Sequence, residues 1–192
     1  MRVISGSAKG RRLKSLPGSS TRPITDRVKT ALFDILGPSI SGARVLDLFA
    51  GTGSVGIEAL SRGAAGAVFV EKDPRAIRVL RENLQQTGLL DRARVIRADV
   101  FAFLRSGPVE PFDFIYVAPP QYRGWWRRTL ELLDARPGWL AASGIIVVQI
   151  HPREFEEVPL HHLHRADRRD YGSTHLLFYR HLERRGQGDE GG

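Results

Sequence analysis

A glycine-rich turn flanked by two acidic residues is the part of the sequence best suited to chemistry. Residues 51–56 read Gly-Thr-Gly-Ser-Val-Gly, a G-x-G-x-x-G pattern between an apolar run at 45–49 and a helix-like stretch. Glycines let the backbone turn tightly and a ligand approach it, and the helix start offers free N–H groups. Asp47 lies within the apolar run, and Glu71 ends the next one, where an acid can bind a ribose hydroxyl. This pattern predicts a nucleotide-type site, although three glycines alone fit an empty strand-to-helix turn equally well.

The position of Asp47 favours one class of cofactor over another. A dinucleotide places its pyrophosphate at the helix start, where a nearby carboxylate would repel it. S-adenosylmethionine (SAM) has no phosphate, and its ammonium group would be attracted by an acid just before the turn. An unpaired charge inside an apolar strand is costly, so we expect Asp47 at the open end of the strand with a partner. The stretch therefore favours SAM, with NAD(P) as the alternative.

Apolar runs that alternate with helix-like stretches predict an α/β fold built on a mostly parallel, doubly wound sheet. After residue 151 the pattern changes, and residues 160–165 alternate in a way that predicts an antiparallel hairpin at the end of the sheet. We expect residues 168–172 to form its turn and residues 173–182 its last strand. The other expected strands are 45–49, 68–71, 94–97, 112–117 and 144–150, with helices at 28–36, 55–62, 74–86, 101–104 and 125–133.

Composition narrows the class of protein further. The 192 residues, 42% of them hydrophobic, are enough for one α/β domain with a proper core. Since the chain has no cysteine, it cannot form a disulfide or a thiolate metal site. The net charge of +8 favours a polyanionic partner such as nucleic acid. No long apolar run or signal-type N-terminus appears, so we expect a soluble cytoplasmic protein without a membrane span.

All six histidines lie between residues 151 and 181. His162 and His164 would share one face of a strand, where two imidazoles could hold a metal ion. No cysteine or acidic cluster accompanies them, so surface histidines on an edge hairpin are the better interpretation. We expect no metal site.

The first 16 residues carry five basic side chains and no acid. Two short strands joined by a loop at residues 6–10 would make a small hairpin, which must pack on the main domain because such a ribbon is too small to be stable alone. A solvated arm is the alternative. We expect this segment to contact RNA phosphates and not the cofactor. The candidate phosphate-binding residues are Arg2, Lys9, Arg11, Arg12 and Lys14.

Three motifs give the chain a specific family resemblance. Residues 22–28 read Arg-Pro-Ile-Thr-Asp-Arg-Val, residues 31–33 read Ala-Leu-Phe, and residues 45–53 read Val-Leu-Asp-Leu-Phe-Ala-Gly-Thr-Gly. The last of these resembles motif I of SAM-dependent methyltransferases. Together they resemble the RsmD family of 16S rRNA guanine-N2 methyltransferases, and the likeness covers nearly the whole chain except the tail.

This resemblance implies a Rossmann-like class I methyltransferase with a seven-stranded sheet and a small N-terminal β-hairpin. It implies division into the extension at 1–16, a methyltransferase domain at 17–185 and a disordered tail at 186–192. SAM would be the methyl donor, and the substrate would be 16S rRNA, within a 30S particle or an assembly intermediate. Asp99 would meet the adenine, although a helix N-cap explains it equally well. The implied cofactor-binding residues are Arg22, Thr25, Asp26, Asp47, Phe49, Gly51, Thr52, Gly53, Glu71, Lys72, Asp99 and Val100.

The segment after the fourth expected strand reads Ala118-Pro119-Pro120-Gln121-Tyr122. This segment resembles the Asp/Asn-Pro-Pro-aromatic motif of enzymes that methylate exocyclic amines. In that motif the acid or amide and a backbone carbonyl orient the amine, and the aromatic ring stacks on the flipped base. These five positions are the candidate catalytic residues.

The chain departs from this pattern at its first and last positions, since Ala118 cannot accept a hydrogen bond. Gln121, a backbone carbonyl or a water would have to accept instead. Tyr122 or one of two tryptophans, Trp125 and Trp126, would supply the stacking, unless both tryptophans are core residues. An inactive SAM-binding, RNA-binding protein is therefore the alternative to an enzyme.

Overall fold

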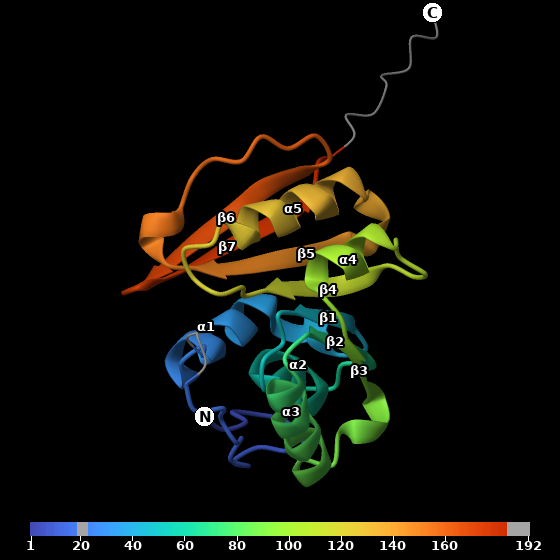
Figure 1. Cartoon of the computed structure of the whole chain (residues 1–192), viewed down its shortest axis with the longest axis vertical. Helices are drawn as coiled ribbons and strands as arrows, with labels where there is room; N and C mark the ends of the chain where they lie inside the picture. Colours follow the sequence, from blue (N-terminus) through green and yellow to red (C-terminus); the bar gives the residue numbers. More distant parts are fainter. Residues whose placement is uncertain (19–22, 184–192) are drawn as a thin grey trace, which may run out of the picture.

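A seven-stranded sheet with the strand order β3-β2-β1-β4-β5-β7-β6 forms the centre of the protein, whose computed structural model describes residues 1–18 and 23–183 (Figure 1). Neighbouring strands are parallel from β3 to β5, and β7 runs antiparallel to both β5 and β6. The predicted sheet, with its antiparallel C-terminal end, is confirmed. The strands are β1 (Arg44–Leu48), β2 (Gly66–Glu71), β3 (Ala93–Arg97), β4 (Phe112–Val117), β5 (Leu140–Ile150), β6 (Leu163–Tyr171) and β7 (Thr174–His181).

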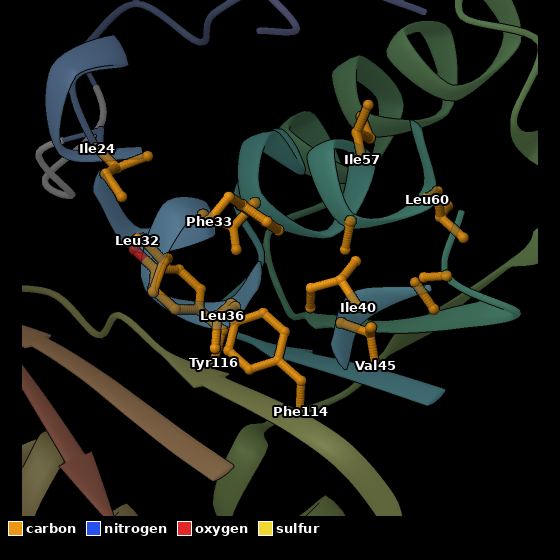
Figure 2. Close-up of a cluster of buried hydrophobic side chains, with 14 of the residues drawn as sticks. Ile24, Leu32, Phe33, Leu36, Ile40, Val45, Ile57, Leu60, Phe114 and Tyr116 are labelled. Atoms are coloured by element: carbon orange, nitrogen blue, oxygen red, sulfur yellow. The ribbon is translucent and has the colours of Figure 1, made fainter. Parts of the chain in front are cut away.

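Helices cover both faces of this sheet, which is why its central strands are apolar throughout (Figure 1). Helices α1, α2 and α3 share one core cluster with one face, and α4 and α5 share the second cluster with the other. Figure 2 shows Phe114 and Tyr116 pointing from β4 into the first cluster, with Leu32 and Phe33 of α1. The helices are α1 (Asp26–Leu36), α2 (Ser54–Ser61), α3 (Pro74–Gln86), α4 (Val100–Arg105) and α5 (Trp125–Ala135), with short 3₁₀ helices η1 (Gly37–Ile40), η2 (Leu90–Arg92), η3 (Pro137–Trp139) and η4 (Pro152–Glu154).

Side-chain caps explain where three helices begin. Thr25 accepts a hydrogen bond from the N–H of Val28 at the start of α1. Asp73 caps α3, whose first residue is a proline, and Asp99 caps α4 by accepting from Ala102. Each cap satisfies a backbone donor that the first helical turn leaves free. The N-cap interpretation of Asp99 is therefore confirmed.

The C-terminal hairpin differs from the prediction in the position of its turn. Residues 168–171 belong to strand β6, and the chain turns at Gly172 and Ser173 instead. Arg168 donates a side-chain hydrogen bond to Asp170, and Arg169 donates one to Asp167. Opposite charges two residues apart therefore pair along each face of this edge strand. A charged edge strand is one way in which sheets avoid unwanted pairing, and a charge-rich stretch need not be a turn.

The sequence predicts surface histidines, but the histidines do not all lie on the surface. His175 on β7 is only 6% exposed. Within residues 1–18 and 23–183, no group of three metal-ligating side chains is arranged to hold an ion. No helix in the same part of the chain is both long and apolar enough to cross a membrane.

The N-terminal segment folds back on itself, but it does not form the two predicted strands. Its antiparallel pairing consists of one bridge, between Arg2 and Arg12, and of the backbone hydrogen bonds beside it, which Val3 donates to Arg11 and Leu13 donates to Met1. The reason is that much of its backbone bonds to the domain: the N–H groups of Ile4 and Ser5 donate to the Glu58 carboxylate. Three apolar side chains of the segment are buried in the first core cluster, namely Val3, Ala8 and Leu13. The expected tail at 186–192 lies outside the described residues.

A buried ion pair between Lys29 of α1 and Glu58 of α2 fastens this segment. The Lys29 Nζ lies 3.3 Å from a Glu58 carboxylate oxygen, and both side chains are fully buried. Lys29 also donates to the carbonyl of Arg2 and to the hydroxyl of Ser54. Burial lowers the pKa of Lys29, and the charge of Glu58 opposes that shift. Since Arg62 also contacts Glu58 at 2.9 Å, the carboxylate has two cations and two N–H donors.

Replacing Lys29 with methionine should destabilise the fold by about 3 kcal/mol, because it leaves the buried Glu58 carboxylate short of a cation. The loss falls at the low end of the range for a broken buried pair, since Arg62 remains. Lys14→Met is the matched control: the side chains of Lys14 and its partner Glu82 are 60% and 41% exposed, so the change should cost less than about 1 kcal/mol. Urea denaturation measures both. Equal losses would contradict the role given to the buried pair.

Candidate active site

One pocket of about 430 Å³ opens at the carboxyl ends of β1, β2 and β4. The sheet order reverses between β1 and β4, and crevices at such a reversal are where open α/β sheets bind ligands. The pocket brings together ten of the residues that the sequence analysis singled out. They are Asp47, Phe49, Gly51, Thr52, Glu71, Lys72, Asp99, Val100, Ala118 and Pro120.

Glu71, at the end of β2, holds the glycine turn in place. Its Oε2 accepts the N–H of Gly51 at 2.8 Å. Its Oε1 accepts the N–H groups of Lys72 and Asp73 at 2.9 and 3.0 Å. A carboxylate has about four acceptor positions, so three are used in shaping the loop and one remains for a ligand hydroxyl. Glu71 thus organises the turn as well as lining the pocket.

Asp47 is a buried acid with a single partner. It is 2% exposed, and its Oδ2 accepts the N–H of Gly56 at 3.1 Å. Burial raises the pKa of Asp47 well above its ordinary value of 3.8, and the charge of Glu71 raises it further. Among the described residues no cation pairs with this carboxyl group. A positively charged ligand group in the pocket would supply the missing partner.

Two glycines of the motif serve the packing beneath the pocket. Gly56 faces the ring of Phe69, which a Cβ at that position would approach to 2.3 Å. Gly53 is not part of the pocket lining, contrary to the role expected of it. Its φ of +89° favours glycine, and a Cβ there would lie 2.2 Å from Leu80 of α3. These glycines let the turn and α2 lie close to the sheet and to α3.

Aromatic rings and cations form the wall near Asp99. Phe49 stacks on Trp125 with ring centroids 6.1 Å apart, and Phe101 packs edge-on against both. Lys72 and Arg123 each place a positive charge about 5 Å above the Trp125 ring. The two tryptophans therefore differ. Trp125 lines the pocket, whereas Trp126 is a core residue that is 1% exposed.

The turn after β4 is held from outside the pocket. The N–H of Tyr122 donates to Glu154 Oε1 at 2.7 Å, and the other oxygen of Glu154 accepts the N–H of His151. Tyr122 has a φ of +61°, a strained value for a bulky residue. Its ring is 61% exposed and lies beside the His151 ring. Ala118 and Pro120 line the pocket, but Pro119, Gln121 and Tyr122 do not.

The described part of the motif before α1 reaches the pocket through two residues that were not predicted to line it. Pro23 and Ile24 line the pocket, while Thr25 caps α1 and Asp26 lies 3.7 Å from Arg2. Neither Thr25 nor Asp26 belongs to the pocket lining. Arg22 lies outside the described residues.

The N-terminal segment forms part of the pocket, contrary to our expectation that it would be separate from it. Met1, Ser15 and Leu16 line the pocket. Its five basic residues, Arg2, Lys9, Arg11, Arg12 and Lys14, are exposed. Arg11 donates to the carbonyl of Gln86, and Lys14 pairs with Glu82. Deletion of the segment would therefore alter the pocket, so point substitutions are needed to test RNA contacts.

Sequence reasoning missed Asn83, which joins the segment to the glycine turn. Its Nδ2 donates to the carbonyls of Lys14 and Thr52, and its Oδ1 accepts the N–H of Lys14. Asn83 is fully buried on α3. An asparagine one residue before Leu84, on the apolar side of a helix, was the available signal. Its partners were not predictable, because Lys14 is 69 residues away.

Comparison with known proteins identifies the family. A family model described as Conserved hypothetical protein 95 matches residues 1–180. Ribosomal RNA small subunit methyltransferase D of Escherichia coli (strain K12) is 40% identical over 149 residues, 78% of this chain and 74% of that protein. The protein of the same name from Haemophilus influenzae is 36% identical over 151 residues, 78% of each chain. The chain belongs to the RsmD family of methyltransferases.

Solved structures agree with this assignment. The Escherichia coli protein yhhF superposes on the RsmD-family chain with a TM-score of 0.82 at 35% identity, covering 94% of this chain and 97% of that one. An RNA methyltransferase from Salinibacter ruber, solved in complex with S-adenosyl-L-homocysteine, has a TM-score of 0.63 at 16% identity. The superposition covers 88% of this chain and 100% of the Salinibacter ruber chain. That second likeness shows the fold.

Asp47→Asn should stabilise the ligand-free protein and weaken cofactor binding. A folded-state pKa above 3.8 means that stability falls as pH rises from 3.8 through the raised pKa of Asp47. Asparagine cannot ionise, so at neutral pH the variant should gain on the order of 1 kcal/mol, raising Tm by roughly 2–4 °C. SAM affinity should fall tenfold or more, since the ammonium loses its counter-charge, a loss of about 1.4 kcal/mol or more.

The surface change Asp34→Asn is the control and should alter neither quantity measurably. Thermal denaturation and calorimetric titration with SAM at pH 7 provide both readouts. Unchanged SAM affinity in Asp47→Asn would show that this carboxyl group does not meet the ammonium.

Proposed function

We propose that this RsmD-family protein transfers a methyl group from SAM to N2 of a guanine in small-subunit rRNA. The observation that carries the proposal is the joining of three features in one pocket: the buried acid Asp47, the acid Glu71 and Pro120 of the proline turn. The first two suit the two polar ends of SAM, and the third suits an exocyclic amine. The names of the family relatives support rRNA as the substrate.

The pocket residues fit SAM without a phosphate site. Asp47 would pair with the ammonium, and Glu71 would accept from a ribose hydroxyl through its remaining lone pair. Asp99 and Val100 would contact the adenine, with Phe49 and Trp125 beside it. When bound, SAM would supply a methyl group attached to a sulfonium. The lone pair of the target nitrogen would form a bond to this methyl group as the carbon–sulfur bond breaks, and the nitrogen would release a proton.

The turn after β4 would hold the target base. Proline fixes φ, so the Pro119-Pro120 pair presents its carbonyl groups in a rigid geometry beside the pocket. A carbonyl at this point accepts one N–H of the amine and turns the nitrogen lone pair toward the methyl group. Tyr122, whose ring is exposed and whose backbone is held by Glu154, lies at the outer end of the same turn and would stack on the flipped base.

The exposed N-terminal residues would position the RNA. Lys9 and Arg12 form no side-chain ion pair with another described residue, whereas Lys14 and Arg2 do. Free cations on this exposed segment, of which Met1, Ser15 and Leu16 line the pocket, suit phosphate groups, which fix the register of a nucleic acid without reading its sequence. The rRNA could be naked or part of a 30S particle; assay of both forms would distinguish them.

Methyl transfer is the direct test. Incubation with tritium-labelled SAM and unmethylated 30S particles should place label on N2 of one guanine, and calorimetry should show SAM binding without NAD(P) binding. Asp47→Asn serves as the control that keeps the fold. SAM binding with no label transferred would favour an RNA-binding protein without activity. Tight NAD binding in place of SAM would refute the methyltransferase assignment.

Replacing Lys9 and Arg12 with alanine should weaken RNA binding and make it less dependent on salt. If each residue neutralises one phosphate of single-stranded RNA, the slope of log K against log salt should fall by roughly 1.4. Arg105→Ala with Arg136→Ala removes the same charge from exposed positions associated with α4 and α5, across the sheet from the N-terminal segment. That control should leave the slope unchanged. Equal slopes in the Lys9/Arg12 variant and the unmodified protein would exclude phosphate contacts at these residues.

A further inference from the structure

The site lacks one group that amine methylation needs. Ala118 stands where an acid or amide would accept an N–H of the target amine, and a methyl side chain cannot accept a hydrogen bond. A carbonyl of the proline turn can hold only one of the two N–H groups. An acceptor from another element of the structure must therefore hold the second one if the amine is to be fixed on both sides.

The neighbouring strand places an amide beside this gap. In the parallel pair of β4 and β5, Tyr116 is opposite Val147 and Val117 is opposite Val148. The next residues in this register are Ala118 and Gln149. Since side chains alternate between the two faces of a strand, Tyr116, Ala118, Val147 and Gln149 all point to the α1 side of the sheet. Both Tyr116 and Val147 belong to the core cluster on that side.

A hydrogen bond confirms that the Gln149 side chain lies on this face. The hydroxyl of Tyr116 donates to Gln149 Oε1. Tyr116 is 4% exposed, and its ring lines the same pocket as Asp47 and Ala118. Figure 2 shows it projecting from β4 toward the side chains of α1. Burial and the charge of Asp47 raise the pKa of Tyr116 well above 10, so its hydroxyl keeps its proton and remains a donor.

We propose that Gln149 accepts the second N–H of the target amine in place of the acid missing at Ala118, and that Tyr116 is the positioning residue for its amide. The inference rests on the proposed function. An amide oxygen has two lone pairs, of which the Tyr116 hydroxyl occupies one. The other has no donor among the described residues and is left to accept an N–H of the target amine. Gln149 is half-buried, so a base in the pocket would exclude water from this contact.

Gln121 is the competing amide, and it is less well held. Neither glutamine belongs to the pocket lining, but the side chain of Gln121, which lies on the turn itself, has no hydrogen-bond partner among residues 1–18 and 23–183. A free glutamine side chain loses rotamer entropy when it is fixed, up to about 2 kcal/mol. The side chain of Gln149 has already lost part of this entropy, because Tyr116 holds it by a hydrogen bond. Pre-organised acceptors are the ones that contribute to a transition state.

The test compares Gln149→Leu with the matched change Gln121→Leu. Single-turnover methylation of unmethylated 30S particles is measured at saturating SAM and RNA, with SAM affinity measured by calorimetry. Gln149→Leu should slow transfer about 100-fold, the scale for one catalytic hydrogen bond, with SAM affinity unchanged. Gln121→Leu should slow transfer at least tenfold less than Gln149→Leu does, because no described residue holds its side chain in place for the amine. Gln149→Glu keeps the acceptor and should remain active, and Tyr116→Phe should fall between.

Rescue separates a chemical role from a structural one. Ala118→Asn restores an acceptor at the usual place, so it should recover most of the rate lost in Gln149→Leu. A merely structural effect of Gln149→Leu would not be recovered. Full activity of Gln149→Leu, or failure of the rescue, would overturn the inference and leave the proposed function standing.

No transfer by the unmodified protein would also overturn the inference, since it holds that Gln149 suffices. Ala118→Asn then decides what else fails. Activity in that variant would show that the site can transfer a methyl group and lacks only the acceptor. Inactivity there would count against the proposed function itself.

Discussion

The reversal of strand order between β1 and β4 is the constraint on which the site depends. Chain connections leave β1 toward one edge of the sheet and reach β4 on its other side, so no crossover covers the carboxyl ends where these strands meet. The glycine turn, Glu71 and the proline turn are all carried to that gap by parallel strands. Short buried strands with helices on both faces hold the three segments in fixed relative positions. The pocket is a consequence of topology, and the side chains only decide what it binds.

Local sequence pattern was sufficient for most of this framework. The spacing of apolar residues and the positions of turn residues predicted the bounds of β2, β4 and α3 to within a residue or two, because each element follows from apolar spacing and a Pro or Gly boundary. The pattern failed at residues 168–171, where four charged or polar residues form a strand because their charges pair along its faces. It failed again in the N-terminal segment, where the backbone donors of Ile4 and Ser5 bond to Glu58, more than 50 residues away.

The same division applies to the site. Asp47, Glu71 and the glycines were recognisable because their spacing in sequence reflects a local strand–turn–helix unit. Asn83 and the Lys29–Glu58 pair were not, since their roles exist only between distant segments. Those long-range contacts have a functional consequence. They fix the basic segment against α1, α2 and α3, so that the surface expected to meet RNA is joined to one wall of the pocket.

Ala118 and Gln149 extend this reasoning from position to chemistry. A catalytic acceptor is defined by the point in space that it reaches, and neighbouring strands of a parallel sheet bring different residues to nearly the same point. The departure at Ala118 removes a side chain from β4, but the register of β5 offers another beside it, already hydrogen-bonded to Tyr116. The buried acid Asp47 and the half-buried amide of Gln149 thus have opposite needs. Asp47 lacks a positive partner, and Gln149 retains a free lone pair. The proposed ligands, a cationic cofactor and an amine donor, would satisfy both.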